Sequence, residues 1–274
     1  MKIALIFNKT RPDTTGIYYE KACKKQGHLV THFNTTDFGN IPNQYDLYLK
    51  IDDDYWKYRM PSSLHPSVLT VHDTHLKNAY KHILKLIPQF DIIGAASHVG
   101  YSTLKNKFPR KKIFWLPFAC DEDIHTPPHP LSTKYDIAFI GTDGGIPRKF
   151  ILDLLRERYP NSYIGPAHHT KMATIYGQAK LGFNFQPILV MRIFESMAGG
   201  CLTLTNTNIP ENISALFENK KHLVMYDSIQ HSYDLIDYYL KHDEERKSIA
   251  QAGQQLVLEK HTYLNRLNTI LEYV

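Results

Sequence analysis

Arg192 and Glu195 are the residues of this chain whose types and spacing best suit chemistry. They lie in the segment 191–206, which reads Met-Arg-Ile-Phe-Glu-Ser-Met-Ala-Gly-Gly-Cys-Leu-Thr-Leu-Thr-Asn. Side chains three residues apart share one face of a helix. A guanidinium there can pair with a phosphate, and a carboxylate can accept hydrogen bonds from a ribose diol. The pair therefore favours a site for an anionic, sugar-bearing nucleotide, with an ordinary surface ion pair as the alternative.

The elements expected around this pair are a short helix and a buried strand. Apolar residues at 193, 197 and 198 fall on one helical face, and the glycines at 199 and 200 supply a left-handed turn. The apolar run 201–204 then ends at Thr205 and Asn206. Such a run is typical of a parallel strand that brings polar groups to the edge where ligands bind.

A glycine-containing loop supplies a second set of candidates. Residues 139–148 read Phe-Ile-Gly-Thr-Asp-Gly-Gly-Ile-Pro-Arg, so that a strand ends in glycines and a helix begins. The free N–H groups of a helix N-terminus bind phosphate, and glycines let the backbone approach it. Gly141 and Thr142 would lie in this loop, and Arg148 would pair with a diphosphate. An ordinary turn is the alternative.

Polar residues also follow the neighbouring strands of the same half. Gly165 and His168 follow a short strand and suit contact with a nucleobase. Asn184 and Gln186 lie where the next strand ends, and together with Thr205 they suit the binding of sugar hydroxyls. A second histidine follows His168, but no further ligands converge there, so we predict no metal site.

His72, Asp73 and His75 form the best candidate catalytic site in the first half of the chain. They follow an apolar strand in the sequence Val-His-Asp-Thr-His, at the edge where a parallel sheet binds ligands. We expect this cluster to cap the reacting sugar. The alternative is that Asp73 or Thr74 only caps a helix. The second and third candidates are the loop 8–16 and the pair Ser97-His98.

An acidic triplet at 52–54 needs a separate interpretation. Paired aspartates can hold a divalent cation through oxygen ligands. Here the triplet follows a strand and precedes Tyr-Trp-Lys-Tyr-Arg. We interpret it as a solvated loop, with stacking of Trp56 on a sugar as the second interpretation and no metal.

The order of elements predicts an α/β protein with two doubly wound, Rossmann-like domains that face each other across a cleft. Apolar strands and amphipathic helices alternate, which is typical of parallel sheets. The prolines at 127, 128 and 130 cannot continue a helix. We therefore expect a compact N-terminal acceptor domain at 1–125, a linker at 126–133 and a donor-binding domain at 134–274. We also consider that the last helix packs back on the first domain.

Composition excludes several classes of protein. No apolar run approaches the roughly 20 residues of a membrane span. The three cysteines are widely spaced, which argues against a disulfide framework or a zinc ribbon and indicates a reducing cytoplasm. The net charge of +5 is modest and dispersed, so nucleic acid is a disfavoured partner, while weak peripheral membrane contact fits. Common hydrolase and phosphate-loop motifs are absent from the sequence.

The second half resembles the group 1 retaining glycosyltransferases of the GT-B fold, in the spore-maturation-protein-like branch. The resemblance covers residues 134–274 in order, and the first half resembles the family more loosely through residues 91–93 and 115–121. The motifs that carry it are Phe139-Ile140-Gly141, the run from Ala173 through Tyr176 to Asn184, Met191 to Gly200, Asp243 to Arg246, Ala252-Gly253 and His261-Thr262-Tyr263.

The resemblance implies roles for individual residues. Glu195 matches the glutamate that binds the donor ribose, and Arg192 would lie beside the diphosphate. The family pattern has a second glutamate eight residues earlier, where this chain has Pro187. Asn184 or Gln186 would take part of that role, or the sugar is held differently. His72 or His75 would match the first-domain histidine that contacts the transferred sugar.

The expected function is that of a hexosyltransferase. It would move a hexose-type sugar from a nucleoside-diphosphate sugar to an unknown acceptor, with retention and without a metal or other cofactor. A UDP-sugar is the favoured donor and a GDP-sugar the alternative. The acceptor would be a glycan, lipid, small molecule or protein. The alternative functions are a transferase that acts on modified nucleic acid and a non-catalytic nucleotide-sugar-binding homologue.

Overall fold

The chain divides into two compact units in the computed structural model, which describes residues 1–10, 14–52, 59–186, 188–207 and 211–274. One unit is formed by Met1–Pro117 together with Tyr263–Val274, and the other by Phe118–Thr262. This division differs from the expected boundaries. Residues 118–133, which include the expected linker, lie in the second unit. The last helix lies in the first unit, which agrees with the possibility that it packs back on the first domain.

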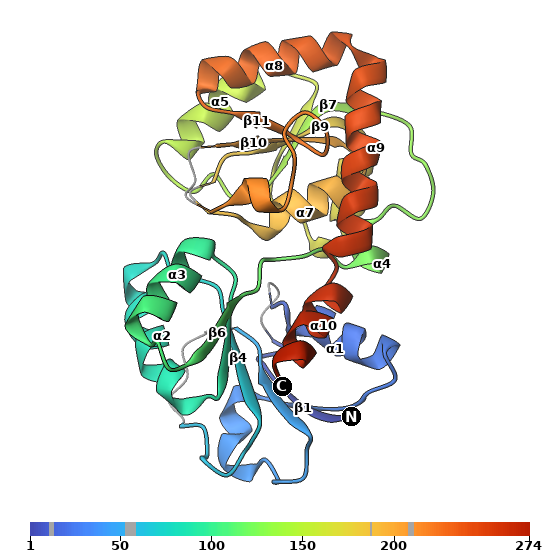
Figure 1. Cartoon of the computed structure of the whole chain (residues 1–274). Coiled ribbons are helices and arrows are strands. Elements are labelled where there is room, and N and C mark those ends of the chain that lie inside the picture. The colour runs from blue at the N-terminus through green and yellow to red at the C-terminus, as the bar shows by residue number, and fades with distance from the viewer. Residues whose placement is uncertain (11–13, 53–58, 187, 208–210) are drawn as a thin grey trace. The chain divides into compact units, whose positions relative to one another are not determined.

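The first unit is built on a six-stranded parallel sheet (Figure 1). The strand order β2-β1-β3-β4-β5-β6 reverses between β1 and β3. Ligands of open α/β sheets bind beside such a reversal, at the carboxyl ends of the strands. The strands are β1 (Lys2–Ile6), β2 (Leu29–Phe33), β3 (Leu47–Lys50), β4 (Ser67–Val71), β5 (Ile92–Ala95) and β6 (Lys112–Trp115). The helices are α1 (Gly16–Lys25), α2 (Lys77–Leu86), α3 (His98–Lys107) and α10 (Tyr263–Tyr273).

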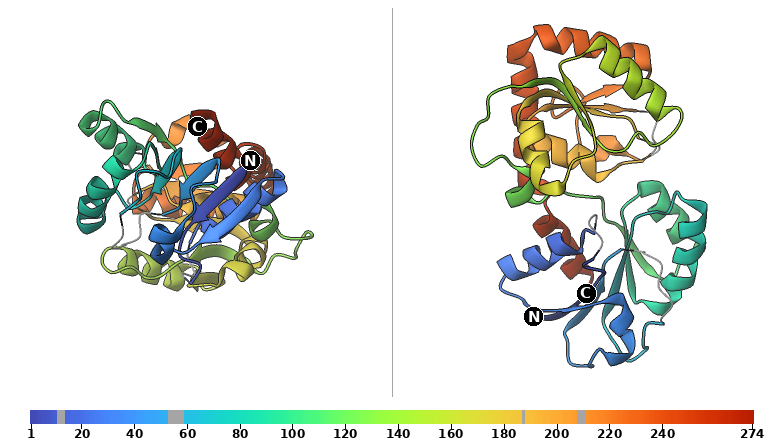
Figure 2. Two further views of the ribbon diagram at one scale, coloured as in Figure 1. Left: turned by 90° about the horizontal axis from the view of Figure 1, so that it is seen from below. Right: turned by 180° about the vertical axis from the view of Figure 1, so that it is seen from behind.

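Aromatic contacts hold the C-terminal helix α10 in this first unit. Tyr263 stacks on Tyr18 of α1 with ring centroids 4.9 Å apart. At the other end of α10, Tyr273 stacks on Phe114 of β6 at 4.1 Å. Both views in Figure 2 show α10 beside α1. The last helix therefore completes the fold of a unit whose other elements lie before residue 118.

The second unit contains a five-stranded parallel sheet of order β11-β10-β9-β7-β8. Its order reverses between β7 and β9, which marks the expected ligand position. Two parallel sheets confirm the predicted α/β class. The strands are β7 (Tyr135–Ile140), β8 (Ser162–Gly165), β9 (Ala179–Asn184), β10 (Leu202–Asn206) and β11 (Val224–Tyr226). The helices are α4 (Glu122–His125), α5 (Arg148–Arg158), α6 (His169–Gly177), α7 (Met191–Ala198), α8 (Ile229–Lys241) and α9 (Asp243–Lys260).

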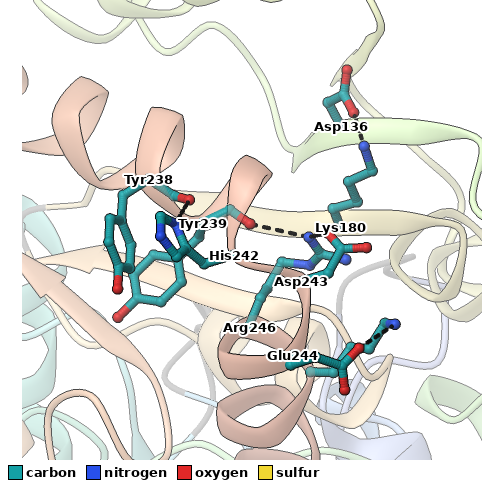
Figure 3. Close-up of polar contacts among 9 residues, drawn as sticks. Asp136, Lys180, Tyr238, Tyr239, His242, Asp243, Glu244 and Arg246 are labelled. Carbon is teal, nitrogen blue, oxygen red and sulfur yellow. Dashed lines mark hydrogen bonds and ion pairs between the residues drawn. The ribbon is translucent and has the colours of Figure 1, made fainter.

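A polar corner turns the chain from α8 into α9 (Figure 3). The buried guanidinium of Arg246 donates from Nη1 to the carbonyl oxygen of Tyr239 at 3.0 Å and also pairs with Asp243. The ring of His242 stacks on Tyr238 at 3.8 Å. The corner directs α9 toward α7 and β10, which it covers.

Gly253, in the middle of α9, permits the close approach of this helix to the turn before β11. A Cβ atom there would lie far inside van der Waals contact with the carbonyl oxygen of His222. We expect Gly253→Ala to lower the unfolding free energy by about 1–3 kcal/mol, because backbone atoms must shift. Gly39→Ala, where nothing lies within 4 Å, is the control and should change it by less than about 0.5 kcal/mol. Urea unfolding measures both, and equal effects would contradict this packing argument.

Candidate functional site

Three polar side chains meet at the strand reversal of the second sheet. Arg148, the first residue of α5, donates from Nη2 to the Oε1 atom of Gln186 at 2.6 Å. Gln186 follows β9, and its backbone N–H donates to Oδ1 of Asn206 at 3.0 Å. The Nδ2 atom of Asn206, at the end of β10, donates back to the Gln186 carbonyl at 2.9 Å. Arg148 is thereby aimed across the crevice where anionic ligands of such sheets bind.

The glycine loop after β7 gives Arg148 the room that it needs. Gly144 has a φ of +64°, and a Cβ atom there would lie 2.5 Å from the Nη1 atom of Arg148. Gly141 anchors the loop because its N–H donates to the Gly165 carbonyl at 3.1 Å. Thr142 is exposed. The loop thus has a fixed start and an open tip, as a phosphate loop requires.

Glu195 of α7 is a buried carboxylate whose side chain is only 1% exposed, whereas that of Arg192 is 30% exposed. Its Oε2 atom forms an ion pair with Nη1 of Arg192. Its Oε1 atom lies 3.4 Å from Nε2 of His125. The alternative of an ordinary surface pair is therefore wrong for Glu195. A buried carboxylate has lost the solvation of water, so positively charged groups or hydrogen-bond donors must lie near its two oxygens to offset that loss of free energy.

His125 was not anticipated from the sequence, which placed it at the end of the N-terminal domain, whereas the structure places it in the short helix α4 of the second unit. Asp121 caps α4, since its Oδ1 atom accepts from the N–H groups of Asp123 and Ile124 at 3.0 Å. The N–H of Asp121 donates to Nδ1 of His125 at 2.9 Å. A neutral imidazole that accepts at Nδ1 carries its proton on Nε2, which faces Glu195. An aspartate four residues before a histidine was the available signal.

Buried polar atoms that lack partners gather at the same sheet edge. Asn184 and Thr205 are paired residues of the neighbouring strands β9 and β10. Among the described residues, Nδ2 of Asn184 and Oγ1 of Thr205 make no hydrogen bond. Buried polar groups normally find partners, so these two atoms are suited to bind the polar groups of a ligand.

Gly165 and His168 remain candidates for the nucleobase. Gly165 ends β8, and His168 is exposed and precedes α6. The Nδ1 atom of His168 lies 2.9 Å from Oγ1 of Thr170, and its ring packs on that of His169 at 4.1 Å. Within the described residues, no group of three or more histidine, cysteine and acidic side chains could hold a metal ion.

In the first unit, the three predicted catalytic residues differ in their burial. His72 is half-buried, and its Nδ1 atom lies 2.6 Å from Oδ1 of Asp52, while Asp73 and His75 are exposed. Asp52 is itself only 5% exposed, so the solvated-loop interpretation is wrong for this member of the acidic triplet. It failed because the residues that surround Asp52 are distant in sequence. Asp53, Asp54 and Trp56 lie outside the described residues, as does Pro187.

Two capping assignments also differ from expectation. Leu76, rather than Asp73 or Thr74, occupies the N-cap position of α2, and Oγ1 of Thr74 makes no hydrogen bond with any described residue. Ser97 caps α3 instead, since its Oγ atom accepts from the N–H of Gly100 at 3.0 Å. Ser97 therefore has a structural role that accounts for its position.

The family comparison is consistent with this architecture. A model of the family described as glycosyl transferase-like matches residues 129–272, more than half of the chain. No curated protein sequence matches the chain. No helix among the described residues is long and apolar enough to cross a membrane.

Three solved structures resemble the whole chain. HepE from Anabaena, solved with UDP and glucose, is 13% identical with a TM-score of 0.70, over 100% of this chain and 99% of its own. A sucrose-phosphate synthase from Thermosynechococcus elongatus is 12% identical with a TM-score of 0.67, over 100% and 98%. An alpha-glucosyltransferase solved with UDP and DNA is 11% identical with a TM-score of 0.71, over 99% and 98%. These likenesses confirm the GT-B fold.

The burial of His125 predicts how stability depends on pH. Burial lowers the pKa of His125 below its usual value, so below about pH 6.5 the unfolded chain gains a proton that the folded chain resists. Wild-type stability should therefore fall as the pH decreases from 7 to 5. His125→Gln lacks this titrating group. The unfolding free energy of the wild type minus that of the variant should therefore decrease, by at most about 1.4 kcal/mol per pH unit, as the pH falls.

Urea unfolding at several pH values measures this advantage. His129→Gln, which removes an exposed histidine from the same unit, is the control. A wild-type advantage over His125→Gln that grows toward low pH would show that His125 is not held in its neutral form.

Proposed function

From the membership of this chain in the glycosyl transferase-like family, which makes it a glycosyltransferase, we propose a specific reaction. In this reaction, the protein transfers a hexose-type sugar from a UDP-sugar to an acceptor. The observation that carries the proposal is the buried Glu195 carboxylate. Arg192 and His125 hold it at two oxygens without removing its capacity to accept more hydrogen bonds. A ribose diol supplies two hydroxyl donors of the kind that such a carboxylate binds.

The diphosphate would bind at the strand reversal between β7 and β9. Arg148 contributes a planar cation there, and the N-terminus of α5 contributes a partial positive charge. Neutralisation of the diphosphate makes UDP a better leaving group, which is the main chemical requirement of sugar transfer. UDP as the nucleotide is supported by HepE and the alpha-glucosyltransferase, both of which were solved with UDP.

The finer features of the proposal follow from the resemblance. We place the chain in the spore-maturation-protein-like branch, and we expect transfer with retention and without a metal. Where the family has a second glutamate, this chain has Pro187. Asn184 and Thr205 would take over part of the sugar binding of that glutamate. The cytoplasm remains the proposed compartment, and three buried cysteines with free thiols support it.

Glu195→Gln tests the ribose contact with little change in volume. The amide keeps one acceptor oxygen but loses the charge and brings an N–H₂ group against Arg192. We expect UDP affinity to fall about 10- to 100-fold, since hydrogen bonds to charged groups contribute about 1.5–3 kcal/mol. Glu218→Gln, which changes an exposed glutamate of the same unit, should bind UDP normally. Calorimetric titration with UDP measures both, and unchanged binding by Glu195→Gln would remove the ribose assignment.

Arg148→Ala tests the diphosphate contact separately from the nucleoside contact. Loss of the guanidinium should weaken UDP binding about 10-fold or more while uridine binding stays near the wild-type value. Arg158→Ala, at the far end of α5, is the matched control because Arg158 pairs with Asp237 on the surface. A titration of each variant with UDP and with uridine separates the two contributions. Equal losses for both ligands would place Arg148 outside the phosphate site.

A further inference from the structure

A second buried polar cluster lies in the first unit, at the carboxyl ends of β3 and β4. Its centre is the contact of 2.6 Å between Oδ1 of Asp52 and Nδ1 of His72. The side chains of Asp52 and His72 are only 8% and 15% exposed. These strands are neighbours beside the reversal of strand order between β1 and β3. The cluster therefore lies at the edge where a ligand of this sheet is expected.

The carboxylate of Asp52 is fixed by hydroxyl groups from a distant segment. Thr14 donates from Oγ1 to Oδ2 at 3.1 Å, and Thr15 donates to Oδ1 at 3.3 Å. The backbone N–H of Asp52 donates to Oγ1 of Thr70 on β4 at 3.0 Å. Both oxygens and the backbone of this residue are thus held by groups outside its own loop.

Asp52 also has an unusual backbone conformation. Its φ is +67°, in the left-handed region that only a few per cent of non-glycine residues adopt. Aspartate and asparagine tolerate this region better than other residues, but it still requires compensation from surrounding contacts. The conformation turns the side chain of Asp52 toward His72 at the end of the next strand.

A buried lysine holds the backbone on which Asp52 lies. Lys50 is fully buried, and its ammonium group donates to the carbonyl oxygens of Ile51 at 2.7 Å and Asp52 at 2.5 Å. These two hydrogen bonds fix the backbone of residues 51 and 52, from which the side chain of Asp52 extends.

A second Asp–His pair in the same unit shows what a surface contact looks like. His65 and Asp91 approach to 2.9 Å between Nδ1 and Oδ2, but their side chains are 58% and 40% exposed. They lie where β4 and β5 begin, at the opposite edge of the sheet from ligands. Asp91 also accepts from the N–H of Ser67 at 2.8 Å, which organises the start of β4. Unlike Asp52–His72, this pair is exposed, lies at the amino ends of the strands and contains no residue with a positive φ.

We propose that Asp52 is a positioning residue that holds His72 with its proton on Nδ1, so that Nε2 accepts a hydrogen bond from a substrate hydroxyl. A carboxylate at Nδ1 selects this tautomer and fixes the direction of the ring. The inference rests on the proposed sugar transfer and selects His72, rather than the exposed His75, as the histidine that contacts substrate. The hydroxyl belongs to the transferred sugar or to the acceptor.

The tautomer of His72 provides a test that needs no substrate. Nitrogen-15 spectra of the full chain, with the His72 signals assigned by comparison with His72→Ala, should show neutral His72 protonated on Nδ1. Asp52→Asn keeps a residue that tolerates positive φ but replaces the carboxylate by a weaker acceptor, so the Nε2-protonated form should increase. Asp91→Asn, in the exposed pair, is the control and should leave His72 unchanged. An Nε2-protonated His72 in the wild type, or no response to Asp52→Asn, would overturn the proposal.

Hydrolysis of UDP-glucose then identifies the source of the hydroxyl. If it belongs to the transferred sugar, Asp52→Asn should lower kcat about 10-fold or more. His72→Ala and the double variant should then lose a similar amount, because Asp52 acts through His72. If it belongs to the acceptor, hydrolysis should be unchanged in all three variants. Additive losses would overturn the proposal, since Asp52 would then act apart from His72.

Binding of UDP keeps this inference separate from the proposed function. The groups assigned to UDP belong to the second unit, so Asp52→Asn should bind UDP with wild-type affinity. Failure of the wild type to bind UDP would refute the proposed function and leave the tautomer result interpretable. A loss of UDP affinity in Asp52→Asn equal to its loss of kcat would instead indicate a general structural defect and overturn the positioning role.

Discussion

The burial of the Glu195 carboxylate is the constraint on which the donor side of this protein depends. A carboxylate that loses water loses several kcal/mol of solvation unless cations and hydrogen-bond donors replace it. Arg192 supplies the cation from the same helix, and His125 of α4 places its Nε2 atom 3.4 Å from the other carboxylate oxygen. This requirement explains why a helix of four residues, capped by Asp121, lies in a segment rich in proline.

Both units apply the same geometric principle to different chemistry. A parallel sheet places the ends of all its strands at one edge, and a reversal of strand order opens a crevice there. In the second unit this crevice contains Arg148 and Gln186, which suit an anion. In the first unit the corresponding region contains Asp52 and His72, which suit a hydroxyl. The difference lies in the residues after each strand, whereas the sheets that position them are alike.

The sequence predicted most elements because their patterns are local. The short helix and the buried strand expected in the segment 191–206 are α7 and β10 of the structure. The position of Asp52 could not be predicted in this way. Three adjacent aspartates are usually solvated, and the threonines that bind Asp52 precede it by 37 and 38 residues. His125 was missed for a related reason, since its partner Glu195 is 70 residues away and its helix is too short to show periodicity.

The donor, acceptor and charged groups of the candidate site together constrain the ligand more strongly than any single residue does. Oε1 of Glu195 is a buried acceptor that makes no hydrogen bond within the part of the chain that the structure describes, so a ligand of the second unit is expected to bring a hydrogen-bond donor to it. Nδ2 of Asn184 is a donor, and the hydroxyl group of Thr205 acts in either role. Arg148 adds a requirement for negative charge. A nucleotide sugar meets all of these conditions because its hydroxyls donate, its ring and carbonyl oxygens accept, and its diphosphate carries the charge. A simple phosphate would leave Oε1 of Glu195 without a hydrogen-bond donor, and a neutral saccharide would leave Arg148 without an anion.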